Sequence, residues 1–160
     1  DLESISGVST IVCARTAQLA GHGHVYSLEH SPEYAYKTRR MLASYGLEQW
    51  ATVIDAPLKA VGGSAPWYDI SSLPARVTGV DLLLIDGPPA STAPKARGPA
   101  FQMLLPRLGS SFLIVLDDAA RPDEMAIVAD WKKSAPDLIV TTLPAEKGCT
   151  LLERTAVSRP

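Results

Sequence analysis

Short apolar runs alternate along this chain with stretches in which apolar residues recur at helical spacing. Runs rich in valine, isoleucine and leucine predict strands at residues 24–29, 51–55, 80–86, 111–118, 137–143 and 149–154. Strands that alternate with helices are typical of βαβ units, which form a mostly parallel sheet. The pattern therefore predicts an α/β fold with helices on both faces of a sheet.

The stretches between the strands predict three helices, of which the first covers about residues 9–20 and the last about 122–133. The middle helix starts at Ser31, Pro32 and Glu33. These supply a capping hydroxyl, a proline at the first helical position and an acid near the positive end of the helix dipole. Its apolar stripe is predicted to comprise Tyr34, Thr38, Met41, Leu42 and Tyr45.

Local details predict how the strands pair. The run at 80–86 has no polar alternation, which is typical of a central strand covered on both faces. Only residues 144–148 separate the last two runs, which is too short for a helical crossover and predicts an antiparallel hairpin. Residues 59–79 are rich in Gly, Pro and Ser, so a long loop with one helical turn is expected. Trp67 and Tyr68 are expected to form a hydrophobic plug beneath it, and the alternative is that they shield a ligand.

Length and composition predict one globular domain over residues 1–160. The chain has 160 residues, of which 46% are hydrophobic and 20% charged, as is usual for soluble globular proteins. It begins abruptly with Asp1, Leu2 and Glu3, which look like the end of a strand. We therefore expect a domain that lacks its N-terminal segment.

Charge and cysteine content narrow the expected partners. The formal net charge of −2 offers no basic excess to neutralise phosphates, so no nucleic-acid partner is expected. No apolar run reaches membrane-spanning length, so no membrane partner is expected either. Cys13 and Cys149 lie far apart, which favours reduced thiols and a cytoplasmic location.

Acidic residues close the predicted strands. A single such acid is most often a helix cap or a solvated strand end, but here the feature recurs at five strand ends. In an open parallel sheet, ligands bind outside the carboxyl ends of the strands. The pattern therefore predicts a ligand site formed by Glu3, Glu29, Asp55, Asp86, Asp117 and Asp118.

The spacing of one acid indicates a ribose. Glu29 follows Gly7 by 22 residues, and in dinucleotide folds the acid that binds the ribose hydroxyls lies about 20 residues past the glycine-rich turn. The turn at residues 3–10 lacks the GxGxxG spacing that cradles a pyrophosphate. A ligand with a ribose but no phosphates fits better than a nicotinamide dinucleotide.

Several segments resemble one family nearly end to end. The turn ESISGVST resembles the E-x-G-S-G-x-S-T turn of class I methyltransferases, which use S-adenosylmethionine. The segments VYSLEHSPEY, ATVIDAPL, VDLLLIDGPPAS and EKGCTLLER resemble its later strands. The resemblance implies a Rossmann-like seven-stranded sheet in the order 3-2-1-4-5-7-6, with strand 7 antiparallel.

The resemblance also implies a set of cofactor-binding residues. The strand-1 turn would meet the methionine end of the cofactor, the residues after strand 2 its ribose, and the residues after strand 3 its adenine. The residues implied are Glu3, Ser6, Gly7, Ser9, Glu29, His30, Asp55, Ala56 and Asp86. Asp86 would lie nearest the sulfonium, as the catalytic residue.

The function implied is methyl transfer to the oxygen or nitrogen of an unidentified small-molecule substrate, by alignment of donor and acceptor. The alternative is a methyltransferase-like domain with weak or no catalysis that acts as a binding or structural module. Ile5 favours this alternative, because it replaces the first glycine of the turn, where a branched side chain resists positive φ. The resemblance also allows a homodimer.

Asp86, Asp117 and Asp118 match the acids that bind a divalent metal in the catechol-type branch of these methyltransferases. Carboxylates alone suit magnesium, manganese or calcium. The alternative is that Asp117 or Asp118 caps the helix at residue 122 while Asp86 orients the cofactor. Pro89 stands where that branch has a lysine, and Arg97 is expected to be solvated or to meet an anionic acceptor.

Overall fold

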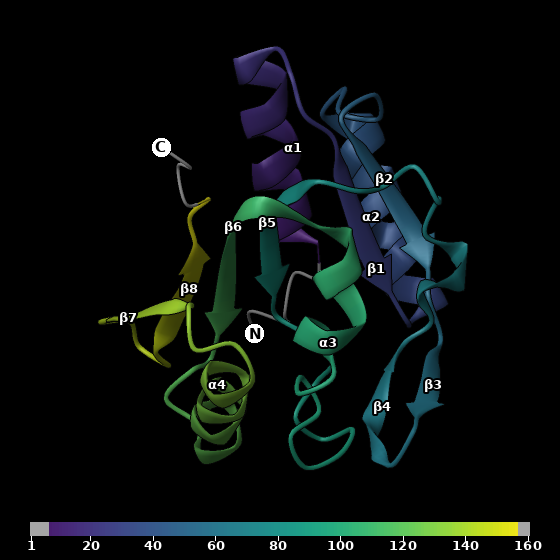
Figure 1. The fold of residues 1–160 in the computed structure, drawn as a ribbon. Helices are drawn as coiled ribbons and strands as arrows, with labels where there is room; N and C mark the ends of the chain where they lie inside the picture. Colours follow the sequence, from purple (N-terminus) through teal and green to yellow (C-terminus); the bar gives the residue numbers. More distant parts are fainter. Residues whose placement is uncertain (1–6, 157–160) are drawn as a thin grey trace. The chain divides into compact units, whose positions relative to one another are not determined.

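The computed structural model describes residues 7–156 (Figure 1). The predictions for Glu3, Ile5 and Ser6 lie outside these residues. The chain divides into two compact units, one of residues up to Lys59 with Tyr68–Pro74, and the other of Ala60–Trp67 with residues from Ala75 onward. Each unit is described by itself.

The first unit has two helices and two parallel strands in alternation. Its elements are α1 (Val8–Ala20), β1 (Val25–Glu29), α2 (Pro32–Ser44) and β2 (Ala51–Asp55). Strands β1 and β2 pair in parallel over their whole lengths, and the last pair in the register is Glu29 with Asp55. The carboxyl ends of both strands therefore lie side by side, as the alternating pattern predicts.

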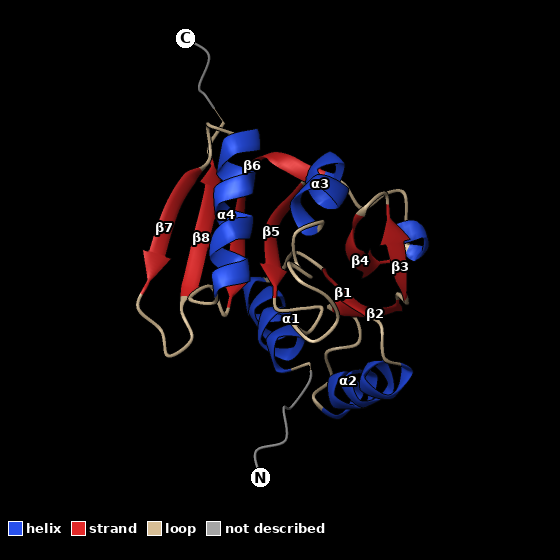
Figure 2. Ribbon diagram, turned by 90° about the horizontal axis from the view of Figure 1, so that it is seen from below, coloured by secondary structure: helices blue, strands red, loops and turns tan. Residues whose placement is uncertain are grey.

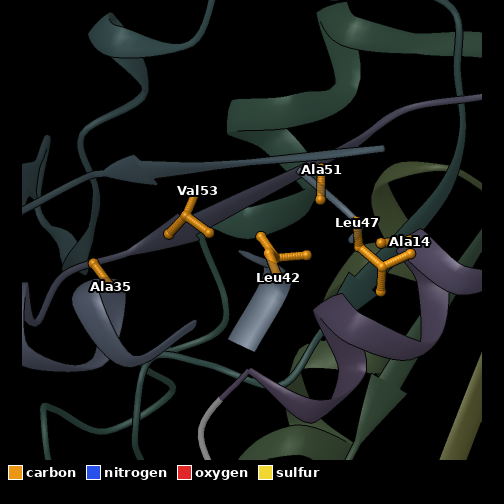
Figure 3. Packing of buried hydrophobic residues seen from close by; sticks show 6 residues of the cluster. All are labelled: Ala14, Ala35, Leu42, Leu47, Ala51 and Val53. Atoms are coloured by element: carbon orange, nitrogen blue, oxygen red, sulfur yellow. The ribbon is translucent and has the colours of Figure 1, made fainter. Parts of the chain in front are cut away.

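The core of the first unit is built largely from small side chains. Ala14 of α1 and Ala35 of α2 are completely buried, together with Leu47 in the connection to β2. Figure 3 shows the cluster they form with residues of α2 and β2; its members are Ala14, Ala35, Leu42, Leu47, Ala51 and Val53. Alanine at the helix positions lets each helix approach its neighbours closely, which produces tight packing in a small unit.

Helix α2 starts as its sequence predicts. The Ser31 hydroxyl accepts a hydrogen bond from the backbone N–H of Tyr34 at 3.4 Å, and Pro32 is the first helical residue. The predicted apolar stripe is partly wrong, because Tyr34 is 39% exposed and Tyr45 56%. The buried positions are Ala35, Thr38 and Leu42, since the smaller Ala35 takes the place toward the core.

The segment predicted as a long loop contains a hairpin. Strands β3 (Leu58–Val61) and β4 (Ser64–Tyr68) pair as a two-stranded sheet, and a single 3-10 turn, η1 (Ile70–Ser72), follows. The helical turn is thus confirmed, whereas the loop prediction is wrong for the hairpin. Gly62 and Gly63 both have positive φ, which permits the tight reversal between strands too short to show an alternating pattern.

The second unit is a four-stranded mixed sheet with two helices (Figure 2). Strands β5 and β6 are parallel, and β8 is antiparallel to both β6 and β7, in the order β5-β6-β8-β7. The bounds are β5 (Val80–Ile85), α3 (Ala100–Leu104), η2 (Leu105–Arg107), β6 (Leu108–Asp117), α4 (Pro122–Ser134), β7 (Ile139–Leu143) and β8 (Cys149–Arg154). The predicted antiparallel hairpin is confirmed.

The predicted sheet order is found in two separate parts. Pair β2-β1 corresponds to strands 3-2 of that order, and β5-β6-β8-β7 to strands 4-5-7-6. The strand predicted between them falls on residues before Gly7, outside the described chain. The seven-stranded order therefore stays a prediction.

One face of the second sheet is well covered. Ile114, Leu116 and Leu152 are completely buried, and the rings of Phe101 in α3 and Trp131 in α4 lie 5.8 Å apart. On the opposite face, Leu82 and Leu84 of β5 are 44% and 38% exposed, so the prediction that both faces of this strand are covered is wrong for these residues. Both helices of the unit lie together, which explains the one-sided burial.

Two expectations from composition can be checked on the described residues. Cys13 and Cys149 are free, which confirms that they form no disulfide. Within residues 7–156, the helices are too short or too polar to cross a membrane.

Gly7, which precedes α1, is predicted to tolerate no side chain. Its φ is +91°, and an added Cβ would overlap the Thr38 side chain. Gly7→Ala should lower the free energy of unfolding by about 1–3 kcal/mol for the backbone strain, and further for the overlap. Urea unfolding measures this loss. Gly21→Ala is the control, because Gly21 has φ +74° but open space around it. Equal losses in the two variants would contradict a close contact with Thr38.

Candidate functional site

Glu29 lies at the carboxyl end of β1 in the first unit. Its side chain is 17% exposed, and its Oε1 accepts a hydrogen bond from the backbone N–H of Ser31 at 2.8 Å. The carbonyl of Glu29 accepts from the N–H of Ala56 at 2.8 Å, which joins the ends of β1 and β2. The carboxylate is thus held at the strand end, immediately before α2.

The His30 ring lies beside this carboxylate, and the Tyr68 ring lies beside His30. The Nδ1 atom of His30 is 3.2 Å from Oε1 of Glu29, and the His30 ring lies 5.9 Å from the ring of Tyr68. Trp67 is 3% exposed, as expected of a hydrophobic plug, but Tyr68 is oriented toward His30. No local pattern in the sequence indicates that these two rings meet, because their contact depends on the unpredicted hairpin of β3 and β4.

The residues after β2 are engaged within the first unit. Arg39 of α2 approaches the Asp55 carboxylate to 2.7 Å and donates a hydrogen bond to the Val53 carbonyl at 2.9 Å. Ala56 is completely buried. The adenine contacts assigned to Asp55 and Ala56 therefore stay predictions, and the charge of Asp55 is balanced by Arg39.

The start of α1 is the described part of the predicted glycine turn. Gly7 stands at the N-cap in the left-handed conformation, and half-buried Ser9 lies in the first turn. The hydroxyl of Thr10 donates to the Ser27 hydroxyl at 2.9 Å, which ties α1 to β1. The hydrogen bond between Thr10 and Ser27 thus connects the first turns of α1 to β1 within the first unit. The roles assigned to Gly7 and Ser9 stay predictions.

Three acids gather in the second unit. The carboxylates of Asp86, Asp117 and Asp118 all lie within 4.8 Å of one another, and we call this set the acidic cluster. They meet because β5 and β6 are parallel neighbours, with Ile85 paired to Leu116 just before the acids. This proximity was predicted from the strand ends.

Arg97 lies among these acids, buried, and its terminal guanidinium nitrogens are hydrogen-bonded at the strand ends. It is 2% exposed, and its guanidinium donates to the carbonyls of Asp117 at 2.7 Å and Asp86 at 3.0 Å and to the Asp118 carboxylate at 3.1 Å. The expectation that Arg97 is solvated is wrong, since the residue is buried, and its possible contact with an anionic acceptor stays a prediction. The connection from β5 to α3 carries it back to the strand ends, a contact that no local pattern indicates.

The acidic cluster is flanked by further charges. Arg121 pairs with the Asp118 carboxylate at 2.9 Å, and Arg97 Nε lies 3.9 Å from Oε1 of buried Glu124. The alternative role of Asp117 or Asp118 as a side-chain cap of α4 is not confirmed, because Arg121 is the N-cap residue and α4 has no side-chain cap bond. The all-oxygen donor set suits magnesium chemically, but Asp118 already pairs with two guanidinium groups.

The Asp86 carboxyl titrates in an unusual environment. Its partial burial and the neighbouring charge of Asp117 raise its pKa above the ordinary value, and the charge of Arg97 acts in the opposite direction. Asp86 nevertheless remains 57% exposed. The acid at the end of β5 is therefore accessible and disfavoured in its charged form.

The comparisons identify the family. A model of the family described as "Methyltransferase domain" matches residues 4–119, so this chain belongs to that family. A search of curated proteins found no match.

Solved structures support the fold. A putative O-methyltransferase from Klebsiella pneumoniae has a TM-score of 0.67 at 24% identity, with 96% of this chain and 70% of that chain covered. The N-terminal domain of human METTL16 in complex with SAH has 0.63 at 13%, covering 96% and 59%. SAH-bound PaMTH1 from Podospora anserina has 0.61 at 17%, covering 92% and 67%. These likenesses indicate a Rossmann-like α/β fold.

This chain spans less than three-fifths of some of these neighbours, including a methyltransferase from Geobacter sulfurreducens with TM-score 0.54 and 15% identity. In that comparison 82% of this chain and 58% of the other are covered.

Replacement of Asp86 should change stability with pH. A raised pKa means that the native state favours the protonated acid, so this contribution to stability is present at acidic pH and lost as pH rises through the raised pKa. Asp86→Asn should therefore raise Tm at pH 7 by about 1–2 °C, with the gain vanishing near pH 3. Thermal unfolding monitored by circular dichroism measures both.

Asp137→Asn provides the control with the opposite sign. Its hydrogen bond to Arg154 lowers the pKa of Asp137, so loss of that charge should lower Tm at pH 7. A lower Tm in Asp86→Asn at pH 7 would show that the charged form of Asp86 is favourable.

Proposed function

We propose that this chain binds S-adenosylmethionine and transfers its methyl group to an oxygen or nitrogen of a small-molecule acceptor. Family membership and the likeness to two SAH-bound structures support the cofactor. The observation that carries the proposal is the Glu29 carboxylate, anchored at the end of β1 by the Ser31 N–H.

The anchoring of Glu29 suits a ribose. A carboxylate has two oxygens that accept hydrogen bonds, and the Ser31 N–H already orients one of them. In the proposal, the carboxylate accepts from both ribose hydroxyls. Ser31 also caps α2, so the same short segment fixes the helix and the acid. Binding therefore costs little side-chain ordering.

The neighbouring residues complete the proposed cofactor site. The rings of His30 and Tyr68 flank the adenine or ribose, and Asp55, the last residue of β2, borders the adenine together with Ala56. The turn before α1 approaches the methionine end through Gly7 and Ser9, with Glu3 and Ser6 preceding them. Asp86 is proposed as the catalytic residue nearest the sulfonium on the family resemblance alone.

The chemistry proposed for these residues is mainly one of alignment. S-adenosylmethionine bound there would supply an electrophilic methyl group. The acceptor oxygen or nitrogen would form a bond to the methyl carbon as the carbon–sulfur bond breaks, the acceptor's proton would pass to solvent, and S-adenosylhomocysteine would leave. Holding donor and acceptor in line and excluding water supplies the rate enhancement. We assign no divalent metal to this reaction, because Asp118 of the acidic cluster is paired with Arg97 and Arg121.

A small-molecule acceptor is favoured over nucleic acid because the net charge is −2. The free cysteines are in keeping with a cytoplasmic location, and a homodimer is compatible with the proposal. The competing proposal is a methyltransferase-like module without catalysis. The observation that favours it is Ile5, in place of a glycine of the family turn.

Glu29 should determine cofactor affinity. Glu29→Gln is expected to weaken S-adenosylhomocysteine binding about tenfold to a hundredfold, because a charged acceptor of two hydroxyl bonds is lost. Isothermal titration calorimetry with S-adenosylhomocysteine, and in parallel with NAD, measures this. Glu33→Gln is the matched control, since Glu33 lies on α2 and pairs with Lys37. Unchanged affinity in Glu29→Gln would disprove the ribose assignment, and NAD binding would favour an oxidoreductase.

The Ile5→Gly variant should distinguish the two proposals, a methyltransferase enzyme and a structural module without catalysis. Ile5→Gly is expected to tighten S-adenosylhomocysteine binding severalfold, because glycine permits positive φ and close approach to the ligand. Calorimetry reports the affinity, and release of S-adenosylhomocysteine over a panel of hydroxylated and amino acceptors reports turnover. Binding and turnover absent from both the natural chain and Ile5→Gly would favour the module.

A further inference from the structure

The acidic cluster contains its own cation. We propose that the guanidinium of Arg97 takes the place of a divalent metal at the ends of β5 and β6, so that the natural chain binds no divalent cation at Asp86, Asp117 and Asp118. The proposal rests on contacts within the second unit and not on methyl transfer.

Arg97 contacts the same kinds of oxygen atom that would bind a metal ion. One guanidinium reaches the carbonyl at the end of β5, the carbonyl at the end of β6 and the carboxylate of Asp118, at 3.0, 2.7 and 3.1 Å. It also lies 3.6 Å from Oδ1 of Asp86. Backbone carbonyls and carboxylates are the oxygens that a hard cation such as magnesium would collect. The hydrogen bonds from Arg97 therefore already occupy the carbonyl and carboxylate oxygens that a metal ion would need at the ends of β5 and β6.

The positive charges around Asp118 disfavour a divalent cation there. Asp118 is in ion pairs with both Arg97 and Arg121, at 3.1 and 2.9 Å. A divalent cation bound to that carboxylate would lie about 2.0–2.6 Å from its oxygen, and therefore close to both guanidinium groups. The like charges would repel in a poorly solvated place, since the Asp118 side chain is only 11% exposed. Metal binding through all three acids requires Arg97 to leave.

Burial holds Arg97 in this place. It is 2% exposed, and Glu124, which is 3% exposed, lies behind it with Oε1 3.9 Å from Nε. Removal of a buried partner leaves uncompensated buried charge, which is strongly unfavourable. Arginine is also always protonated, so this positive charge does not depend on pH or on metal supply. Arg97 is thus a permanent positioning residue for both strand ends.

The test is Mn²⁺ binding, followed by electron paramagnetic resonance of the free ion. The natural chain should show no Mn²⁺ site below millimolar concentration that depends on the acidic cluster. Arg97→Met removes the charge at similar volume and should bind Mn²⁺ at least tenfold more tightly. Asp118→Asn added to Arg97→Met should abolish that gain. Arg121→Met is the matched control, because it removes the more exposed guanidinium while Arg97 stays in place.

Two results would overturn the proposal. One is Mn²⁺ binding by the natural chain that Asp118→Asn or Asp117→Asn removes. The other is a folded Arg97→Met variant that binds Mn²⁺ no more tightly than the natural chain. If Arg97→Met does not fold, Arg97→Lys keeps the charge and should leave the natural chain's lack of cluster-dependent binding unchanged. In that case, cluster-dependent Mn²⁺ binding by Arg97→Lys would equally overturn the proposal.

These measurements remain decisive if the proposed function fails. Absence of S-adenosylhomocysteine binding by the natural chain would disprove the cofactor assignment, which depends on Glu29 in the first unit. The Mn²⁺ titration depends only on charges in the second unit, so its outcome is read independently.

Discussion

Parallel pairing of strands that end in acids places negative charges side by side, and the rest of the structure depends on how those charges are compensated. In the first unit, Arg39 pairs with Asp55 after β2. In the second unit, Arg97 and Arg121 pair with Asp118 after β6. Glu29 differs, because its carboxylate is met by a backbone N–H and by His30. A carboxylate that is oriented by neutral or weakly basic groups is not neutralised by a guanidinium, so its negative charge can attract the hydroxyl donors of a ligand. For this reason Glu29 is the strongest candidate for cofactor binding.

The elements that could be predicted are those whose local pattern is strong. The start of α2 follows from Ser31 and Pro32, and the β7–β8 hairpin follows from the shortness of its connection. The β3–β4 hairpin was missed because its strands are short and its composition is that of a loop. The exposure of Leu82 was missed for a different reason. The sequence pattern of an apolar strand is the same whether helices cover one or both of its faces. The burial of its side chains therefore depends on where the other elements lie.

The candidate site shows the same division between local and long-range information. Parallel topology was enough to bring the strand-end acids together, and Asp86, Asp117 and Asp118 do meet. Their counter-ions could not be predicted, because an arginine in a Gly- and Pro-containing connection is ordinarily exposed. Arg97 becomes buried only because the chain returns to the strand ends between β5 and α3. Sequence patterns identify the acids of such a site more readily than the cations that balance them.

The anchoring of Arg97 also determines which part of its connection is free to vary. Around it, the Trp131 side chain donates to the Gly98 carbonyl at 3.0 Å, and the Lys95 N–H donates to the Asp123 carboxylate at 2.8 Å. Lys95 also pairs with Asp130 through its ammonium group, so residues 95–98 are fixed to α4 by several contacts. The earlier part of the connection, from residue 87 to residue 94, shows none of these contacts to α4 among the described interactions. Pro88 is fully buried, so it is held by the core of the unit. If loops after strand ends adapt a methyltransferase to its acceptor, residues 89–94 can change in sequence without disturbing the cation that holds β5 and β6 together.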